Sequence, residues 1–200
     1  LMAKCFQELK LHNKFDFEVK FVVMDPGYSP ENRKVIEDNA KSLHIPITIF
    51  ETDIFDSVYH VENSPCYLCA RMRRGHLYHF AQQLGCNKIA YAHHKDDVID
   101  SFLMSMLYEG RIHTFSPVTH LEKSGVTLIR PLIYALEGEI RAFARANDLP
   151  VCKNPCPADG VTKRQESKDI IDELKVRVPD VKDRIFSSIE GAGIDGWSRH

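Results

Sequence analysis

Two cysteines three residues apart stand at the start of a predicted helix, in the stretch Ser64-Pro-Cys-Tyr-Leu-Cys69. Ser64 suits the capping position before a helix, and Pro65 suits its first residue. Cys66 and Cys69 then lie on one face of the first turns, where the helix dipole favours the thiolate form that binds metals. The alternative is that both are ordinary buried cysteines of an amphipathic helix. A metal site would need further ligands from elsewhere in the chain.

A later loop supplies two more cysteines, in the sequence Cys152-Lys-Asn-Pro-Cys156-Pro-Ala-Asp-Gly160. A loop rich in Pro and Gly is not where cysteines of a packed core are expected. Loops do often carry ligands to a site that a scaffold holds. Cys66, Cys69 and Cys156 would make three ligands, and Cys152 is a candidate for a fourth.

Basic side chains form two groups that could face a polyanion. The first follows the cysteine pair directly: Arg71, Arg73 and Arg74. The second shares one side of a later predicted helix: Lys163, Arg164 and Lys168. The alternative for the second group is a solvated charged face, because Glu166 and Asp169 are interspersed with it.

A third motif, His93-His94-Lys95-Asp96-Asp97, joins a buried-looking strand to the start of a helix. Paired carboxylates at such a place can hold a hard cation such as Mg²⁺, with phosphate oxygens completing its shell. Lys95 or one of the histidines could then contact a phosphate. The alternative is that Asp96 and Asp97 only cap the helix and complement its dipole.

Strand and helix patterns alternate along the chain and must position these motifs. Strands are predicted over 17–24, 46–51, 87–92, 115–120 and 126–130. Helices are predicted over 1–13, 30–44, 65–84, 96–108, 137–147, 162–176 and 179–190, with 53–61 irregular or a short helix. This order predicts an α/β fold with a doubly wound parallel sheet and a C-terminal helical extension.

Ligands of such sheets bind beyond the carboxyl ends of the strands, where the turns Met24-Asp25-Pro26-Gly27 and His93–Asp97 are predicted. We expect a nucleotide-binding domain over 1–150. The cysteine loop and the C-terminal helices then occupy 151–190. A frayed tail is expected over 191–200, which is rich in Gly, Asp and Ser.

Composition excludes several classes of protein. The chain has 200 residues, 44% of them hydrophobic, and a net charge of -2, so any nucleic-acid surface must be a local patch. No apolar run approaches the ~18 residues of a membrane span, and no secretory signal opens the chain. Six unevenly spaced cysteines do not form a disulfide framework, so we expect a cytoplasmic protein with thiols or metal ligands.

The order of these motifs resembles the PP-loop ATP pyrophosphatase superfamily and, within it, the tRNA 2-thiocytidine synthetase family. The resemblance is carried by Cys66-x-x-Cys69, the arginine-rich helix, His93-His94-x-Asp96-Asp97, Ile129-Arg130-Pro131-Leu132 and Cys156. It covers nearly the whole chain. Lysidine synthetases share the histidine–aspartate and Arg-Pro-Leu elements but lack the cysteine set.

The resemblance implies an adenine-nucleotide alpha-hydrolase fold and a tRNA thiolation. ATP would adenylate the C2 oxygen of an anticodon-loop cytidine, with Mg²⁺ neutralising phosphate charge and pyrophosphate leaving. Three cysteines would hold a 4Fe–4S cluster with one open iron, from which sulfide would attack C2 and release AMP. Between the two late cysteines, Cys156 is favoured as the third ligand, because prolines on both sides stiffen its backbone, while Cys152 follows an apolar run and is expected to pack.

Site residues follow from the same resemblance. The Met24 backbone would line the adenine, and Asp25 and His93 would belong to the nucleotide site. Asp97 would lie near Mg²⁺ and the phosphates, and Arg130 would counter phosphate charge. The implied catalytic residues are Asp97, Cys66, Cys69 and Cys156. The expected partners are tRNA, bound by the two basic groups, and a sulfur donor, either sulfide or a cysteine desulfurase-type protein, with a homodimer as one expected assembly.

The sequence departs from the family in three places. The Ser-Gly-Gly-x-Asp-Ser loop that cradles phosphates would lie, with the central strand, just before Leu1. We therefore expect either that the sequence starts inside a longer protein or that the protein lacks ordinary ATPase activity. Ala92 and Asp100 stand where the family often has Gly and Glu, and both changes are mild.

Two other functions stay open at this point. One is a zinc-stabilised module that binds nucleotide or RNA without catalysis, using Cys66, Cys69, Cys152 and Cys156 in a closed tetrahedral site. The other is a PP-loop enzyme that acts on another thio-nucleobase or on a small molecule.

Overall fold

The computed structural model describes residues 1–12, 14–61, 65–151, 156 and 162–198. The chain forms two compact units. The first comprises Leu1–Ile89, Glu122–Val126 and Asn147–Pro155, and the second comprises Ala90–Leu121, Thr127–Ala146 and Cys156–His200.

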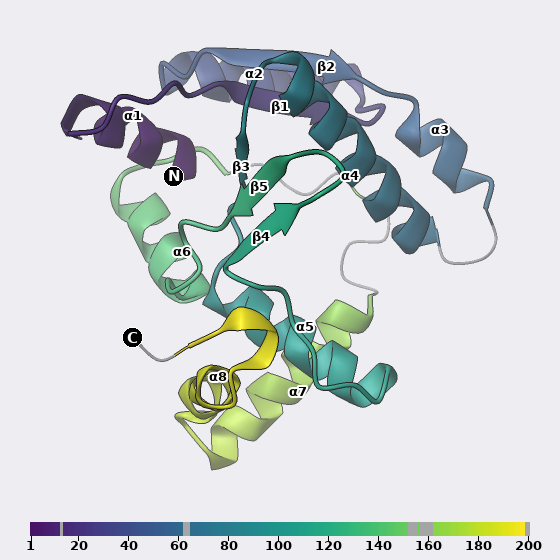
Figure 1. The fold of residues 1–200 in the computed structure, drawn as a ribbon, viewed down its shortest axis with the longest axis vertical. Helices are drawn as coiled ribbons and strands as arrows, with labels where there is room; N and C mark the ends of the chain where they lie inside the picture. Colours follow the sequence, from purple (N-terminus) through teal and green to yellow (C-terminus); the bar gives the residue numbers. More distant parts are fainter. Residues whose placement is uncertain (13, 62–64, 152–155, 157–161, 199–200) are drawn as a thin grey trace. The chain divides into compact units, whose positions relative to one another are not determined.

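The described residues of the first unit form a parallel pair of strands and four helices, which Figure 1 labels. In chain order its elements are α1 (Met2–His12), β1 (Phe21–Asp25), α2 (Pro30–Ser42), β2 (Ile47–Glu51), α3 (Ile54–Tyr59) and α4 (Pro65–Gln83). Helix α2 connects the two strands, as a parallel crossover requires. It begins as the sequence predicts, with Pro30 in its first turn and the Ser29 hydroxyl accepting a hydrogen bond from the Asn32 N–H at 3.3 Å.

Strand β1 is shorter than predicted, since it begins at Phe21 and not at residue 17. Its register with β2 runs from Phe21 opposite Ile47 to Asp25 opposite Glu51. The partner strand follows Pro46, which has no N–H to donate to a ladder. Pairing therefore ends there, and the residues before Phe21 have no strand to pair with in this sheet.

The core of the first unit lies where β2, α3 and α4 meet. Ile54 and Val58 of α3 are buried, as is Ala81 of α4. The rings of Phe50 and Phe80 stack with centroids 4.2 Å apart. This packing holds α4, the helix that carries the cysteine pair.

The second unit contains most of a three-stranded sheet and the C-terminal helices. In chain order its elements are β3 (Lys88–Ala90), α5 (Lys95–Tyr108), β4 (Val118–Leu121), β5 (Val126–Ile129), α6 (Glu137–Ala146), α7 (Lys163–Arg177), α8 (Val181–Gly191) and a short 3-10 helix, η1 (Ile194–Gly196). Strands β3 and β5 each have residues in both units. The strand order is β3-β5-β4.

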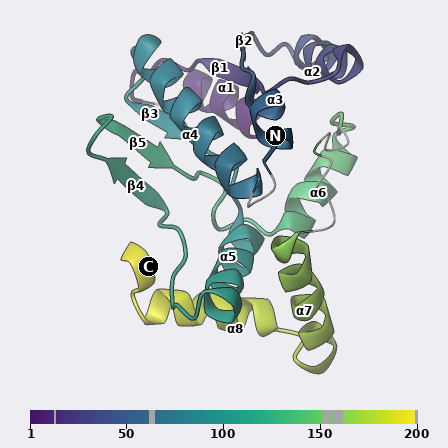
Figure 2. The ribbon, with the colours of Figure 1, turned by 90° about the vertical axis from the view of Figure 1, so that its right-hand side faces the viewer.

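Helices α5, α7 and α8 pack against one another around the core of the second unit (Figure 2). The most deeply buried side chains come from all three helices: Val98, Ile99, Ile171 and Ile189. Because α5 starts at Lys95, within the His93–Asp97 motif, this core fixes the position of the motif relative to α7 and α8.

The expectation of a frayed tail after residue 190 is wrong for the residues that the structure describes. Helix α8 continues to Gly191, η1 follows, and Trp197 is 2% exposed within the core cluster. The Trp197 indole donates to the Phe115 carbonyl at 3.1 Å, and the Asp195 carboxylate accepts from the Thr114 N–H at 2.8 Å. Burial of the Trp197 indole removes a large apolar area from water, and this stabilises the tail against fraying although its composition is typical of a loop.

The predicted α/β class with a parallel sheet is confirmed, and so are the positions of the predicted helices to within a few residues. The division into domains at residue 150 stays a prediction.

We expect Trp197→Ala to lower the free energy of unfolding by about 3–5 kcal/mol, because it leaves a cavity in the core. Urea unfolding followed by circular dichroism measures this. Val176→Ala, which shortens a side chain that is 84% exposed on α7, is the control. Equal stability of the two variants would show that the tail is not part of the core.

Candidate functional site

The turn between β3 and α5 is held by backbone contacts on both sides. The Tyr91 N–H donates to the Ile129 carbonyl and the Lys95 N–H to the Ala135 carbonyl, each at 2.9 Å. His94 occupies the N-cap position, and α5 starts at Lys95. The N-cap therefore lies two residues before Asp96, the residue predicted to cap this helix. The turn therefore presents its side chains from a fixed backbone.

The Asp97 carboxylate binds groups on both of its oxygens. Oδ2 accepts a hydrogen bond from the His94 N–H at 3.0 Å, which caps the helix. Oδ1 lies 3.2 Å from Nη1 of Arg164, which comes from α7. The hydrogen bond expected of a helix cap is thus present in the structure. The Asp97 side chain is still 19% exposed. A role of Asp97 beside Mg²⁺ stays a prediction.

Asp96 is buried and points to two other helices. Its Oδ1 lies 2.5 Å from Nζ of Lys182 on α8, and its Oδ2 accepts from the Glu137 N–H at 2.7 Å, at the start of α6. Burial raises the pKa of Asp96, but the hydrogen bond from Glu137 and the charge of Lys182 outweigh it, so the net pKa is lowered. This carboxylate stays ionised and joins α5, α6 and α8.

Asp100, one turn further along α5, is a buried carboxyl without such a partner. It is 3% exposed, and its Oδ2 has no hydrogen-bond partner among the described residues. Burial raises its pKa to about 6, although the nearby positive charges of Lys168 and Arg164 oppose that rise. From the sequence, Asp100 is notable only because the family often has Glu at that position, whereas the structure shows a buried carboxyl whose pKa is raised to about 6.

His93 lies between two aromatic rings. Its ring centroid is 5.3 Å from that of Tyr91 and 4.8 Å from that of Phe115. Burial lowers the pKa of His93, and the charge of Asp97 opposes this shift only in part. The imidazole is therefore neutral at pH 7, and its buried Nδ1 has no hydrogen-bond partner within the described part of the chain. Such a nitrogen can donate to or accept from a ligand.

Arg130 is buried directly after β5 and contacts both β4 and the segment before it. Its Nη1 donates to the Ser116 carbonyl and, at 3.3 Å, to the Thr119 hydroxyl. The guanidinium also lies over the Phe115 ring, 4.8 Å from the centroid. These contacts stabilise the wall on which His93 packs, and the predicted contact with phosphate stays a prediction.

In the first unit, Asp25 shapes the turn after β1. Its Oδ1 accepts from the N–H groups of Gly27 at 2.9 Å and Tyr28 at 2.7 Å, and its Oδ2 lies 3.5 Å from Arg33. Gly27 has a φ of 108°, which L side chains rarely adopt. The carboxylate is thus committed to the turn that follows Met24, and a direct role of either residue with a nucleotide stays a prediction.

The cysteine pair lies on the first turns of α4, as the sequence predicts. Cys66 is exposed and Cys69 is half-buried. Cys156, which belongs to the second unit, is also half-buried, whereas Ser64 and Cys152 lie outside the described residues. Among the described residues, no group of three or more His, Cys, Asp or Glu side chains could hold a metal ion. Two thiols on one accessible helix turn nevertheless provide the donor chemistry that an iron–sulfur or zinc site needs.

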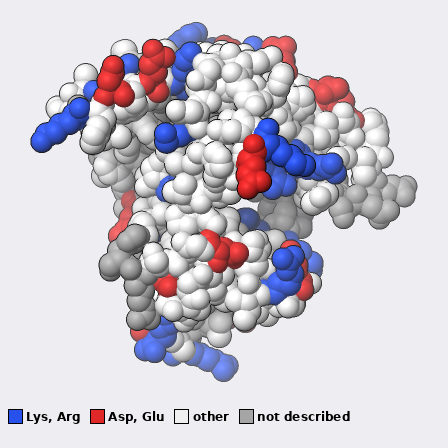
Figure 3. Space-filling model, in the orientation of Figure 1, with Lys and Arg blue, Asp and Glu red and all other residues white. Residues whose placement is uncertain are grey.

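The predicted basic groups differ in how far they are free to meet a polyanion. On α4, Arg71 and Arg74 are exposed, but Arg73 is half-buried and donates to the Tyr28 hydroxyl at 3.2 Å. On α7, each of the three cations predicted to bind RNA has a carboxylate partner: Lys163 pairs with Glu166, Arg164 with Asp97 and Lys168 with Glu137. On the face that Figure 3 shows, basic and acidic side chains are interspersed.

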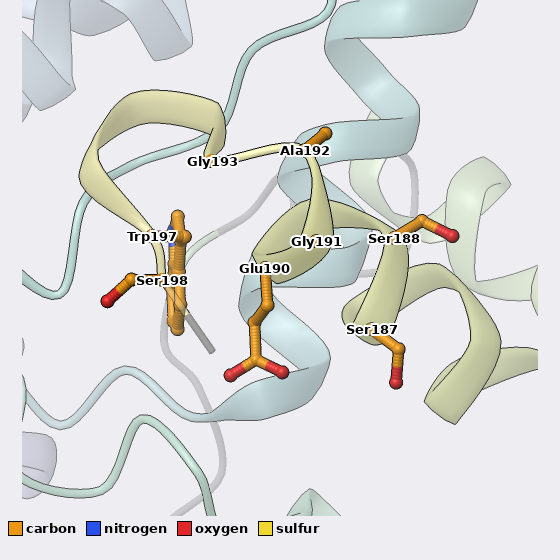
Figure 4. A pocket seen from close by; sticks show the side chains of 8 residues that line it. All are labelled: Ser187, Ser188, Glu190, Gly191, Ala192, Gly193, Trp197 and Ser198. Atoms are coloured by element: carbon orange, nitrogen blue, oxygen red, sulfur yellow. The ribbon is translucent and has the colours of Figure 1, made fainter. Parts of the chain in front are cut away.

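One open pocket of about 770 Å³ lies at the end of α8 (Figure 4). The Glu190 carboxylate and the Trp197 ring line it, and no predicted site residue does. A phosphate would be repelled by Glu190, so we do not assign the nucleotide site there.

None of the helices among the described residues combines the length and the apolar character needed to cross a membrane.

Comparisons with known proteins agree with the motifs. The family model of the PP-loop domain matches residues 3–166. The tRNA-cytidine(32) 2-sulfurtransferase of Pelobacter propionicus is 32% identical over 188 residues, which are 92% of this chain and 70% of that protein. The enzyme of the same name from Citrifermentans bemidjiense is 31% identical over 193 residues, which are 94% of this chain and 76% of that protein.

A solved structure is similar in fold. The U34-tRNA thiolase NcsA from Methanococcus maripaludis, described with its 4Fe–4S cluster, superposes with a TM-score of 0.74. The alignment covers 96% of this chain and 67% of that one, at 20% identity. At this identity the likeness shows the fold alone.

We expect Asp100→Asn to remove a decrease in the free energy of unfolding that the wild-type protein undergoes as the pH rises. The unfolded carboxyl ionises near pH 3.8, while burial keeps the folded one protonated to about pH 6. The native protein therefore loses stability across this window, by up to about 3 kcal/mol. The unfolding free energy of the variant, measured relative to wild type from pH 4 to pH 7, should rise with pH. Asp169→Asn, at an exposed position of α7, makes the same charge change, and an equal pH trend in both variants would contradict the assignment.

Proposed function

We propose that this chain, which belongs to the PP-loop domain family and within it to the tRNA-cytidine(32) 2-sulfurtransferases, thiolates a cytidine of the tRNA anticodon loop in an ATP-dependent reaction. The observation that carries the proposal is the match to curated tRNA sulfurtransferases over nine-tenths of the chain. The accessible thiol pair of α4 is in keeping with the proposal, since thiolates are the ligands that an iron–sulfur cluster needs.

The reaction that we propose has two steps. The C2 oxygen of the cytidine attacks the α-phosphorus of ATP, and pyrophosphate leaves. Sulfide sulfur then attacks C2, and the former C2 oxygen leaves with AMP. A base in a single-stranded loop can be splayed out, which makes C2 accessible to the protein.

The turn between β3 and α5 is the proposed phosphate side of the ATP site. Asp97 lies at the N-terminus of α5, where the positive end of the helix dipole favours bound phosphate, and its carboxylate is a ligand type that Mg²⁺ prefers. The neutral His93 has a buried ring nitrogen to offer a phosphate oxygen. Arg130 would counter phosphate charge. The Met24 backbone, at the end of β1, would line the adenine, and Asp25 would belong to the nucleotide site.

For a 4Fe–4S cluster, we propose Cys66, Cys69 and Cys156 as ligands. The donor chemistry fits, since all three are exposed or half-buried thiols and two of them share one helix turn, although the described residues include no assembled group of three ligands. When three cysteines hold such a cluster, one iron stays open to bind sulfur. Cys152 is the competing candidate for the third position.

We further propose tRNA as the partner, with Arg71 and Arg74 of α4 as its exposed phosphate contacts and Arg73, Lys163, Arg164 and Lys168 as further members of that surface. The sulfur donor would be sulfide or a cysteine desulfurase-type protein. A homodimer is the proposed assembly, and the cytoplasm, where tRNA is modified, is the proposed location.

We expect Cys66→Ala, Cys69→Ala and Cys156→Ala each to lose the iron and the visible absorption of the anaerobically reconstituted protein. Each variant removes one of three thiolates, and the remaining two cannot retain the cluster. Cys152→Ala and Cys86→Ala are the controls and should keep it. Loss in Cys152→Ala as well would mean four cysteine ligands, and stoichiometric zinc in a colourless wild-type protein would favour the binding module without catalysis.

We expect Asp97→Asn to lower the thiolation rate at limiting Mg²⁺ by a factor on the order of ten or more, because an amide binds the cation less well than a carboxylate. An asparagine oxygen can still accept the capping hydrogen bond, so stability should change less than activity. Asp183→Asn, which neutralises the exposed partner of Lys95, is the control. If Asp97→Asn thiolates tRNA with an unchanged Mg²⁺ requirement, Asp97 is a cap and not part of the metal site.

A further inference from the structure

Residues 112–116 lie between α5 and β4 and belong to no helix or strand. The ring of Phe115 in this segment faces two side chains that we propose for the nucleotide site. Its centroid lies 4.8 Å from that of the His93 imidazole and 4.8 Å from Cζ of Arg130. The position of the segment therefore decides how this ring supports His93 and Arg130.

The tail, residues 191–198, binds the backbone of this segment. The Trp197 indole donates to the Phe115 carbonyl at 3.1 Å, and the Asp195 carboxylate accepts from the Thr114 N–H at 2.8 Å. The Ser116 hydroxyl donates to the Asp195 carbonyl. Backbone polar groups outside helices and strands need such partners where water does not reach them. The tail thus supplies hydrogen bonds that a neighbouring strand would otherwise supply.

Thr114 connects the same segment to the start of α5. It is 2% exposed, and its hydroxyl donates to the Val98 carbonyl at 3.1 Å. Val98 directly follows Asp97 near the beginning of α5. The segment is therefore held between the tail and the part of α5 on which the proposed nucleotide site is built.

Asp195 makes its contacts from an unusual backbone conformation. Its φ is 51°, in the left-handed region, which Asp enters more readily than most residues other than Gly. Its Oδ2 also lies 2.9 Å from Nδ1 of His113, so one carboxylate oxygen meets two adjacent residues of the chain. A residue keeps such a conformation where its surroundings hold it there. The contact between tail and segment is therefore specific, and burial of Trp197 alone does not explain it.

We infer that Asp195 is a positioning residue of the nucleotide site, which holds Phe115 so that the His93 imidazole faces a phosphate of ATP. The inference rests on the proposed function and extends the nucleotide site to the tail. Asp195 acts through the segment and not by contact with the nucleotide. Because the proposed tRNA contacts lie on α4 and α7, a change at Asp195 should weaken ATP binding and spare tRNA binding.

The ring signals of His93 report on this coupling without any turnover. They are recorded by NMR in protein with labelled histidine and are identified by their loss in His93→Asn. Asp195→Ala should shift or broaden them, because the neighbouring Phe115 ring loses its fixed position. Asp195→Asn should keep the wild-type signals, since its amide oxygen still accepts from the Thr114 N–H and Asn also adopts the left-handed conformation.

Calorimetry with ATP and with a synthetic tRNA anticodon arm shows whether the coupling reaches the site. Asp195→Ala should weaken ATP binding by a factor on the order of ten, and should change the affinity for the arm by less than about twofold. In Phe115→Leu, which lacks the ring, Asp195→Ala should weaken ATP binding no further. Ile189→Val, which shortens a core side chain of α8 at 0% exposure, is the control for stability and should change neither affinity nor the His93 signals.

The outcomes distinguish this inference from the proposed function. If wild type binds ATP and Asp195→Ala leaves either the ATP affinity or the His93 signals unchanged, the positioning role is overturned and the proposed function stands. If Ile189→Val has the same effect as Asp195→Ala, or if Asp195→Ala weakens both ligands alike, the cause is lost stability and the positioning role is again overturned. If wild type binds no ATP, the inference and the proposed function are both overturned.

Discussion

The buried carboxylate of Asp96 is the contact on which the arrangement of the second unit depends. It binds Lys182 of α8 on one oxygen and the first N–H of α6 on the other. Removing one partner of a buried charge pair typically costs about 3–5 kcal/mol, because the remaining charge is left without compensation. Helices α6 and α8 are therefore tied to the start of α5, and breaking this contact would cost much of the stability that holds the turn before α5 in place.

The same end of α5 gathers two further acidic side chains with different surroundings. Asp97 is partly exposed and meets Arg164, whereas Asp100 is buried and has its pKa raised to about 6. Cations of α7 and α8 thus face carboxylates of α5 across the helix interfaces. In the proposed reaction this places positive charge close to a polyanionic substrate, while Asp97 remains accessible to a metal ion. The C-terminal helices are in this account part of the nucleotide site, and not only an appendage.

Signals local in the chain made much of this fold predictable. Ser29 and Pro30 start α2, Gly85 ends α4 with a positive φ, and alternation of strand and helix indicates the α/β class. Contacts between distant residues have no such signature. Lys182 lies 86 residues from Asp96, and nothing in the sequence around either residue indicates the pair. For the same reason the composition of the tail predicted fraying, although Trp197 is buried.

The central claim is that this protein puts sulfur into a tRNA cytidine, and nucleoside analysis tests it most directly. The gene for this chain is deleted from its own organism, total tRNA is digested, and the nucleosides are measured by mass spectrometry. We predict that 2-thiocytidine disappears in the deletion strain. It should return with the wild-type gene but not with one encoding Cys66→Ala. An unchanged level of 2-thiocytidine in the deletion strain would contradict the account.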